Sequence, residues 1–281
     1  TITFTGATSS APYSFTYNIN GGANQIVTTT VGNSVTITAP TNATGVFNYN
    51  LVSVKDGSAT ACSQLQSGTA TITVKALPTA TITGSTSTCL NSVSPGIIFT
   101  GLIGTAPYTF SYNINGGPVQ TITTTVGNSV TFPAATTVAG TFTYNLLSVQ
   151  EGSPNVCSQS QSGSAVVIVN PLPTASINGS TALCLNSASP VINFTAAAGT
   201  APYTFTYNIN GGPNQTVTTI VGNSVSVIVP TNIAGTFNYN LVSVRDASST
   251  LCSQLQSGSA VVVVYPLPVA DFAISIPSCE T

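Results

Sequence analysis

A repeat with a constant period of 95 residues is the feature that most constrains how this chain folds. The cysteines form two series whose members are separated by steps of 95 residues: Cys62, Cys157 and Cys252, and Cys89, Cys184 and Cys279. The segments APY and VGNSV recur with the same step, and no insertion interrupts it. Self-similarity at a constant, domain-sized period indicates tandem domains, because a chain of this length can bury a core of its own.

Proline-containing segments mark the predicted domain boundaries. They divide the chain into repeats at 1–77, 78–172 and 173–267, and the start of a further repeat at 268–281. Ile2 and Phe4 align with Ile97 and Phe99 inside the second repeat, so we expect the first repeat to lack its first strand and the chain to be a section of a longer array. Proline restricts its own φ and that of the preceding residue, which predicts semi-rigid joints and a rod.

Within each repeat the residue pattern predicts only β-strands. Short β-branched and aromatic runs alternate with Gly, Pro, Asn and Ser clusters, as in sandwiches and barrels. In the second repeat the predicted strands are 79–84, 96–101, 108–115, 119–125, 129–134, 141–149 and 162–170. Tyr108, Phe110 and Tyr112 fall on one face of their strand, and Asn115 and Gly116 follow where a hairpin requires positive φ. We expect a seven-stranded antiparallel β-sandwich without helix.

The near absence of charge limits the partners that the chain can bind. Three basic residues, five acidic residues and no histidine give a formal net charge of −2. Nucleic-acid binding requires a cluster of Lys and Arg, and anionic membranes attract polybasic segments; neither feature is present. The longest strongly apolar run, AVVVVY, is far shorter than the roughly 20 residues that span a bilayer. We therefore expect neither nucleic-acid binding nor membrane insertion of this segment.

Residues able to carry catalysis or bind a metal are scarce. Without histidine, a Ser-His-Asp or Cys-His arrangement is impossible. Asp56, Glu151 and Asp246 are equivalent by the period, and one acid per domain can form neither a glycosidase pair nor the oxygen-rich shell that Ca²⁺ prefers. We expect each acid to lie in a solvated turn before the last strand. The sequence thus predicts no enzyme activity, no cofactor and no metal site.

The aromatic residue after each "AP" loop has two readings. Tyr13, Tyr108 and Tyr203 occupy this position, and an exposed tyrosine there could stack on a sugar. The alternate residues that follow are apolar, however, so the alternation favours burial in the core.

Two cysteine positions per repeat predict disulfides and hence an oxidising compartment. There is no CxxC pair and no histidine to complete a zinc site. We expect pairing within each repeat, which joins Cys89 to Cys157 and Cys184 to Cys252 and leaves Cys62 and Cys279 with partners outside the segment. The alternative pairs cysteines around each proline joint, namely Cys62 with Cys89, Cys157 with Cys184, and Cys252 with Cys279.

A longer set of motifs carries a resemblance over the whole chain. The string LPTATITGSTSTC, GTAPYTF, GTFTYNLLSV and SPNVCSQSQSGSAVVIVNPLP resembles the tandem immunoglobulin-like and PKD-like repeats of very large flavobacterial cell-surface proteins, of which the gliding-motility adhesin SprB is the best-known type. The resemblance implies immunoglobulin-like sandwiches, type IX secretion, display on the outer surface, and a parent protein that serves adhesion or gliding. The chain departs from antibody-type domains because it has no tryptophan and no cysteine in the second and sixth predicted strands.

Two classes of function remain. In the first, the repeats are a structural stalk or spacer of an extracellular adhesin, and their partners are the neighbouring repeats of the same chain. In the second, the repeats are themselves adhesive or self-associating, binding a glycan, a surface, or neighbouring chains in a filament or in the cell-surface machinery. The loops DGSATA, EGSPNV and DASSTL differ between repeats, whereas the core and joint residues recur. This pattern favours the spacer.

Overall fold

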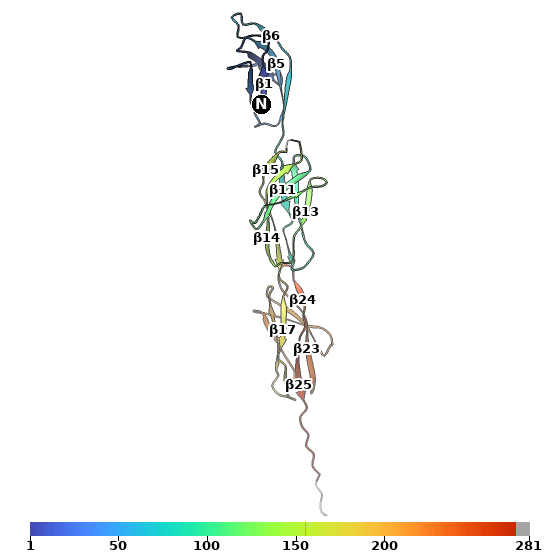
Figure 1. Ribbon diagram of the computed structural model, residues 1–281. Coiled ribbons are helices and arrows are strands. Elements are labelled where there is room, and N and C mark those ends of the chain that lie inside the picture. The colour runs from blue at the N-terminus through green and yellow to red at the C-terminus, as the bar shows by residue number, and fades with distance from the viewer. Residues whose placement is uncertain (155, 274–281) are drawn as a thin grey trace, which may run out of the picture.

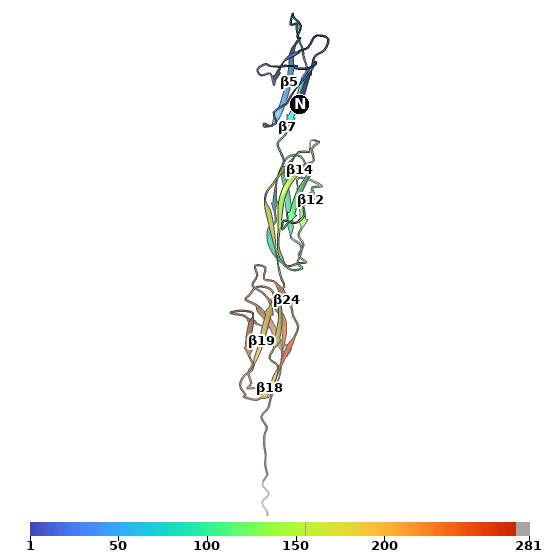
Figure 2. The ribbon, with the colours of Figure 1, turned by 60° about the vertical axis from the view of Figure 1, so that its left-hand side comes forward.

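The computed structural model describes residues 1–154 and 156–273, and all of its regular structure is β-strand. Three β-sandwiches follow one another end to end in a narrow rod (Figures 1 and 2). Every strand pair lies within 1–77, 78–172 or 173–267. Of the predicted further repeat, residues 274–281 with Cys279 lie outside the described residues. Within the described part of the chain there is no helix that could cross a membrane.

Two sheets form the sandwich of the second repeat. The smaller has the order β13-β10-β8 and the larger has the order β12-β11-β14-β16-β9, with β15 paired to β14. The strands are β8 (Thr79–Thr83), β9 (Thr86–Cys89), β10 (Gly96–Ile103), β11 (Tyr108–Ile114), β12 (Gln120–Thr123), β13 (Ser129–Pro133), β14 (Gly140–Glu151), β15 (Ser158–Ser160) and β16 (Ser164–Asn170).

The third repeat has the same arrangement, with sheets β17-β19-β22 and β18-β25-β23-β20-β21, and β24 paired to β23. Its strands are β17 (Thr174–Asn178), β18 (Thr181–Cys184), β19 (Val191–Ala197), β20 (Thr204–Ile209), β21 (Gln215–Thr218), β22 (Ser224–Ile228), β23 (Gly235–Arg245), β24 (Ser253–Leu255) and β25 (Ser259–Tyr265).

The first repeat is smaller. Its two-stranded sheet is β1-β4, and its other sheet has the order β3-β2-β5-β6, with β7 paired to β5. The strands are β1 (Ile2–Thr5), β2 (Ser14–Ile19), β3 (Gln25–Thr28), β4 (Ser34–Ile37), β5 (Gly45–Lys55), β6 (Ser63–Leu65) and β7 (Thr69–Val74).

The core of the second repeat lies between its two sheets and follows the predicted alternation. Tyr108, Phe110 and Tyr112 are buried, while Thr109 and Ser111 between them are only half-buried. Phe99 from the opposite sheet stacks on Phe110 with ring centroids 5.6 Å apart. The tyrosine after the "AP" loop is therefore a core residue, as the alternation predicts.

The predicted hairpin is confirmed. Asn115 and Gly116 have φ values of 51° and 73°, the left-handed region that a tight hairpin turn requires and that Asn and Gly tolerate best. Gly117 N–H donates to the carbonyl of Ile114 at 2.9 Å and closes the turn.

Hydroxyl pairs join neighbouring strands on the outer faces of the sheets. Thr109 Oγ1 lies 2.9 Å from Thr123 Oγ1, and Thr100 Oγ1 lies 2.9 Å from Ser129 Oγ. Each hydroxyl can both donate and accept, so these neutral side chains satisfy one another across the ladder.

The count of seven strands is corrected to nine in the second repeat. Each predicted range contains a strand, but β9 and β15 are additional. Both are short and polar, TSTC and SQS, so neither shows the apolar alternation on which the prediction relied. β9 also pairs parallel with β16, so the sandwich is not wholly antiparallel.

A bulge in β14 changes which side chains point inward. The pairing with β11 shifts register between Ser111 and Tyr112, which leaves Leu147 as the extra residue. An extra residue reverses the alternation beyond it. Leu146 is buried on one side of the bulge, and Val149 and Glu151 are buried on the other.

Candidate functional site

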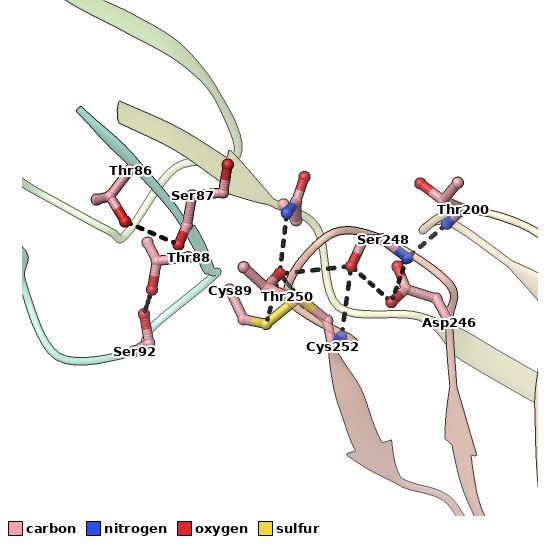
Figure 3. Close-up of a disulfide and its surroundings, with 11 residues drawn as sticks. Thr86, Ser87, Thr88, Cys89, Ser92, Thr200, Asp246, Ser248, Thr250 and Cys252 are labelled. Carbon is pink, nitrogen blue, oxygen red and sulfur yellow. Dashed lines mark hydrogen bonds between the residues drawn. A yellow bond between two sulfur atoms is a disulfide. The ribbon is translucent and has the colours of Figure 1, made fainter. Parts of the chain in front are cut away.

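A disulfide crosses the joint between the second and third repeats (Figure 3). Cys89 is bonded to Cys252, with their Cα atoms 5.7 Å apart and a sequence separation of 163. Cys89 ends β9 of the second repeat, and Cys252 lies in the loop before β24 of the third. We call this bond the joint disulfide.

Parallel pairing places Cys89 at the joint. β9 lies beside β16 with Cys89 opposite Asn170, the last residue of β16. The Leu90 N–H donates to the Asn170 carbonyl at 2.8 Å and extends the pairing by one residue. Because Asn170 directly precedes the proline joint, Cys89 lies at the end of the second repeat that faces the third.

The long strand β23 places Cys252 at the opposite end of its own repeat. β23 begins with Gly235 beside Val264, near the end of the last strand. After β23 ends, the Asp246 N–H donates to the Cys252 carbonyl at 2.9 Å. Cys252 therefore lies at the end of the third repeat that faces the second, and it is only 1% exposed.

Neither predicted cysteine pairing forms in the structure. Within the second repeat, Cys89 lies where β14 starts and Cys157 lies where β14 ends, because the Glu151 N–H donates to the Cys157 carbonyl. The eleven residue steps from Gly140 to Glu151 correspond to about 36 Å at the usual strand rise, too far for a bond. The alternative of Cys62 with Cys89 is more remote still, since these cysteines lie at the outer ends of two successive repeats.

Thr250 and Asn170 complete the polar contacts of the joint disulfide. The Thr250 hydroxyl lies 3.1 Å from Cys252 Sγ and 3.3 Å from Cys89 Sγ. Asn170 Nδ2 donates to Thr250 Oγ1 at 2.9 Å, a second contact across the joint. The sequence did not identify either residue, because neither is present in every repeat: Asn155 stands between Thr60 and Thr250 in their series, and Lys75 and Tyr265 stand in place of Asn170.

A buried carboxylate holds the loop that carries the cysteine. Asp246 is 2% exposed; its Oδ1 accepts from Ser248 Oγ at 2.8 Å and its Oδ2 accepts from the Thr200 N–H at 3.1 Å (Figure 3). The Ser248 hydroxyl also lies 3.4 Å from the Cys252 N–H, which donates to it. The carboxylate therefore connects the cysteine loop to the neighbouring loop at the same end of the sandwich.

Glu151 has the same role in the second repeat. Its Oε1 accepts from Ser153 Oγ at 2.7 Å and its Oε2 accepts from the Thr105 N–H at 2.8 Å. The Ser153 hydrogen bond, then those of Thr105 and Cys157, and the charge of Lys75 outweigh the effect of burial and lower the pKa of this carboxyl. Asp56 in the first repeat bonds Ser9 and Ser58, which lower its pKa.

The expectation of a solvated acid is thus wrong for two of the three repeats. Glu151 and Asp246 are both buried, and the bulge explains why. Without it, the alternation through Tyr144 and Leu146 would turn Glu151 to the solvent; with it, Glu151 faces inward.

The remaining described cysteines are not bonded. Cys62 and Cys184 are exposed and Cys157 is partly buried; Cys279 lies outside the described residues. Burial and then the hydrogen bond with Glu151 raise the pKa of the Cys157 thiol. Residues 1–154 and 156–273 contain no group of three or more His, Cys, Asp or Glu side chains able to hold a metal ion.

Comparisons with known proteins return similarity to structures alone. No protein-family model and no curated protein matches the sequence. Among solved structures, a Ca²⁺-stabilised adhesin with which an Antarctic bacterium binds ice is 17% identical, over 95% of this chain and 69% of that one, with a TM-score of 0.42. A 1.5-MDa bacterial ice-binding adhesin is 16% identical, over 94% and 90%, at 0.42. Invasin, a bacterial integrin-binding protein, is 16% identical, over 95% and 56%, at 0.42. At these identities and TM-scores the functions of these proteins do not transfer to this chain.

Proposed function

We propose that this chain is a stalk or spacer segment of a large extracellular bacterial surface adhesin, of the flavobacterial gliding-motility type that its motifs resemble. The observation that carries the proposal is the joint disulfide between Cys89 and Cys252, which bonds two successive sandwiches across their joint. A cross-link at that place restricts the angle between two domains, which serves a segment whose task is to keep its shape.

The direction of the strands supports this role. Each repeat places strands such as β14, with 12 residues, along the rod (Figure 2). At the usual strand rise a repeat adds on the order of 35 to 40 Å to the length. The disulfide in turn supports an oxidising compartment, since such bonds persist in secreted and surface proteins.

The recurring residues support a structural task as well. Those that recur with the period are mainly core aromatics, turn glycines and cysteines, together with one acidic residue per repeat, and charged side chains number only three basic and five acidic in the whole chain. A binding surface normally gathers aromatic or charged residues in one patch. The aromatic residues of each repeat lie mainly in its core instead, as Phe110, Phe99 and Tyr112 do.

Solution scattering and binding assays test the proposal together. We expect the 281-residue chain to scatter as a rod of about 100 to 120 Å and to show no binding to a glycan panel. EDTA should leave its melting temperature unchanged. Binding of the isolated chain at micromolar or tighter affinity would instead support adhesive repeats, and a compact scattering profile would contradict the stalk.

A further inference from the structure

We infer that the joint disulfide is one instance of a cross-link that closes every joint at which both repeats carry their cysteine; at the joint Lys75–Pro78 the position equivalent to Cys89 falls before Thr1. Cys184 is then the half that bonds the cysteine equivalent to Cys252 in a repeat stacked beyond it. Cys157 is the half that bonds the cysteine equivalent to Cys89 in a repeat stacked before it.

Cys184 is held in the same way as the bonded Cys89. β18 pairs parallel with β25 and places Cys184 opposite Tyr265, as β9 places Cys89 opposite Asn170. The Leu185 N–H donates to the Tyr265 carbonyl at 2.8 Å, the same distance as in the second repeat. Cys184 is exposed at this end of the rod, where a thiol can be reached.

Cys157 is held in the same way as the bonded Cys252. The Glu151 N–H donates to its carbonyl at 3.0 Å, against 2.9 Å for Asp246 and Cys252. The preceding residue, Val156, has a φ of 47°, and its equivalent Leu251 has a φ of 51°. The two loops therefore present their cysteines with the same backbone conformation.

The exposure of the cysteine in the loop before the short strand decreases when a neighbouring repeat stacks on that end of the sandwich. Cys62, at the outer end of the first repeat, is exposed. Cys157, which faces the first repeat, is partly buried. Cys252, which faces the second repeat and is bonded to it, is 1% exposed. The position is thus one that a stacked repeat covers.

The spacing of the cross-link has a mechanical consequence. The bond spans 163 residues, which is longer than one 95-residue repeat, so successive bonds enclose overlapping segments. Between the end of one bond and the start of another, as from Cys62 to Cys89, the backbone path is only 27 residues. Load passes through the bonds and these short paths, and the residues outside the short paths, such as those between Cys89 and Cys157, carry none of it.

The gain in length on unfolding is therefore small. A path of 27 residues reaches at most about 95 Å per two repeats, whereas two unlinked repeats of 95 residues would extend to roughly 650 Å. Two folded repeats already measure on the order of 70 to 80 Å. The cross-links convert the array into a tether that hardly lengthens under load. This mechanical reading rests on the proposed stalk function, whereas the bonds themselves do not.

Bond formation needs an oxidant, here a disulfide such as glutathione disulfide. The Cys184 thiolate attacks one sulfur of that disulfide and releases one glutathione thiolate. The cysteine of the stacked repeat then displaces the second glutathione. Two protein thiols lose two electrons and two protons, and one glutathione disulfide becomes two molecules of glutathione.

A longer chain tests the inference directly. Residues 1–267 followed by a second copy of residues 78–281 keep the period and stack a repeat beyond Cys184. After refolding with glutathione disulfide, peptide mapping should recover Cys184 of the first copy bonded to Cys157 of the second, beside Cys89–Cys252 in each copy. In the 281-residue chain Cys184 should stay open to alkylation. Alkylation of Cys184 in both chains, or its bonding to another cysteine, would overturn the inference.

A serine variant and a pulling experiment complete the test. Cys184→Ser in the first copy should return Cys157 of the second copy to alkylation and leave Cys89–Cys252 intact. Pulling on the ends of the 281-residue chain should release the residues between Cys89 and Cys252, roughly 570 Å, only after reduction. Release without reduction would refute the load path. Glycan binding by the chain would refute the stalk while leaving the bond map unchanged.

Discussion

The two joints of the rod are built from equivalent segments but are held by different contacts. The joint at Asn170–Pro173 carries the joint disulfide and the hydrogen bond from Asn170 to Thr250. At the joint Lys75–Pro78, no disulfide or hydrogen bond connects the two repeats within the described residues, which do not include Asn155. The sandwiches nevertheless follow one another end to end at both joints (Figure 1). The difference teaches that stacking does not depend on the cross-link, which restrains an arrangement that the proline joint already favours.

The largest expected difference between the joints concerns the disulfide itself. We expect Cys89→Ser to lower the free energy of unfolding of the second and third repeats by about 3 to 5 kcal/mol, because a bond closing a long loop restricts the unfolded chain. Chemical denaturation of the oxidised protein measures this. Cys157→Ser is the matched control at the other joint, where no bond forms, and should change little. Equal losses in both variants would show that the bond restrains nothing.

The buried carboxylates beneath the two cysteine loops should differ next. Glu151→Ala removes the acceptor of Ser153 and Thr105, and we expect a loss of about 2 to 3 kcal/mol, as is usual for hydrogen bonds to a charged group. Asp246→Ala should cost less, because the joint disulfide still holds its loop. Denaturation midpoints compare the two variants; a greater loss for Asp246 would contradict a restraining role of the bond.

Acid should act on Glu151 in a defined direction. Its pKa is lower in the folded protein than in the unfolded chain, chiefly through Ser153. Its stabilising effect is therefore complete above the unfolded pKa of about 4.3 and is lost as the pH falls through the folded value. Ser153→Ala should weaken this dependence. Melting temperatures between pH 6 and pH 2, measured for both proteins, provide the test; identical slopes would exclude the assignment.

A smaller effect is expected from the hydrogen bond across the second joint. Thr250→Ala removes the acceptor of Asn170 and should cost about 1 kcal/mol, the usual net value of one such bond. Thr60 occupies the equivalent position in the first repeat and is exposed, so Thr60→Ala is the control and should be nearly neutral. Chemical denaturation measures the free energy of unfolding of both variants. Equal losses would show that the threonine stabilises only its own loop and not the joint.

The smallest effect is expected at Lys75, which stands in place of Asn170 at the first joint. Lys75→Asn removes a cation whose charge lowers the pKa of Glu151. The Lys75 side chain is exposed, and exposed charge pairs contribute between about 0 and 1 kcal/mol. We expect a change of a few tenths of a kcal/mol at most, measured by denaturation. A loss above that range would show that Lys75 holds the joint.

Much of the fold could be predicted because its signals are local. The alternation through Tyr108, Phe110 and Tyr112 identifies a strand and its buried face, and Asn115 with Gly116 identifies a turn. β9 could not be found in this way, since TSTC has no alternation and its pairing with β16 depends on residues about 80 positions away. Register in a sheet is set by such distant partners.

The joint disulfide was missed for the same reason. The sequence predicts that Cys89 and Cys252 are each bonded, but the choice of partner depends on which end of the sandwich each cysteine occupies. The parallel pairing of β9 places Cys89 at one end, and the loop after β23 places Cys252 at the other. The burial of Glu151 was missed because the alternation of residues before Leu147 does not predict a bulge at that position.

The outer faces of the sheets carry neutral hydroxyl pairs, such as Thr109 with Thr123. We therefore expect the structure of the rod to be insensitive to ionic strength. Dissolved salt screens charges over a Debye length of about 10 Å at 0.1 M, but neutral hydroxyl pairs offer it nothing to screen. We therefore expect the scattering profile of the rod to be the same in dilute buffer and in brine. A stalk with such a surface keeps the same length in fresh water and in sea water. A stalk made rigid by charge repulsion would instead shorten in sea water.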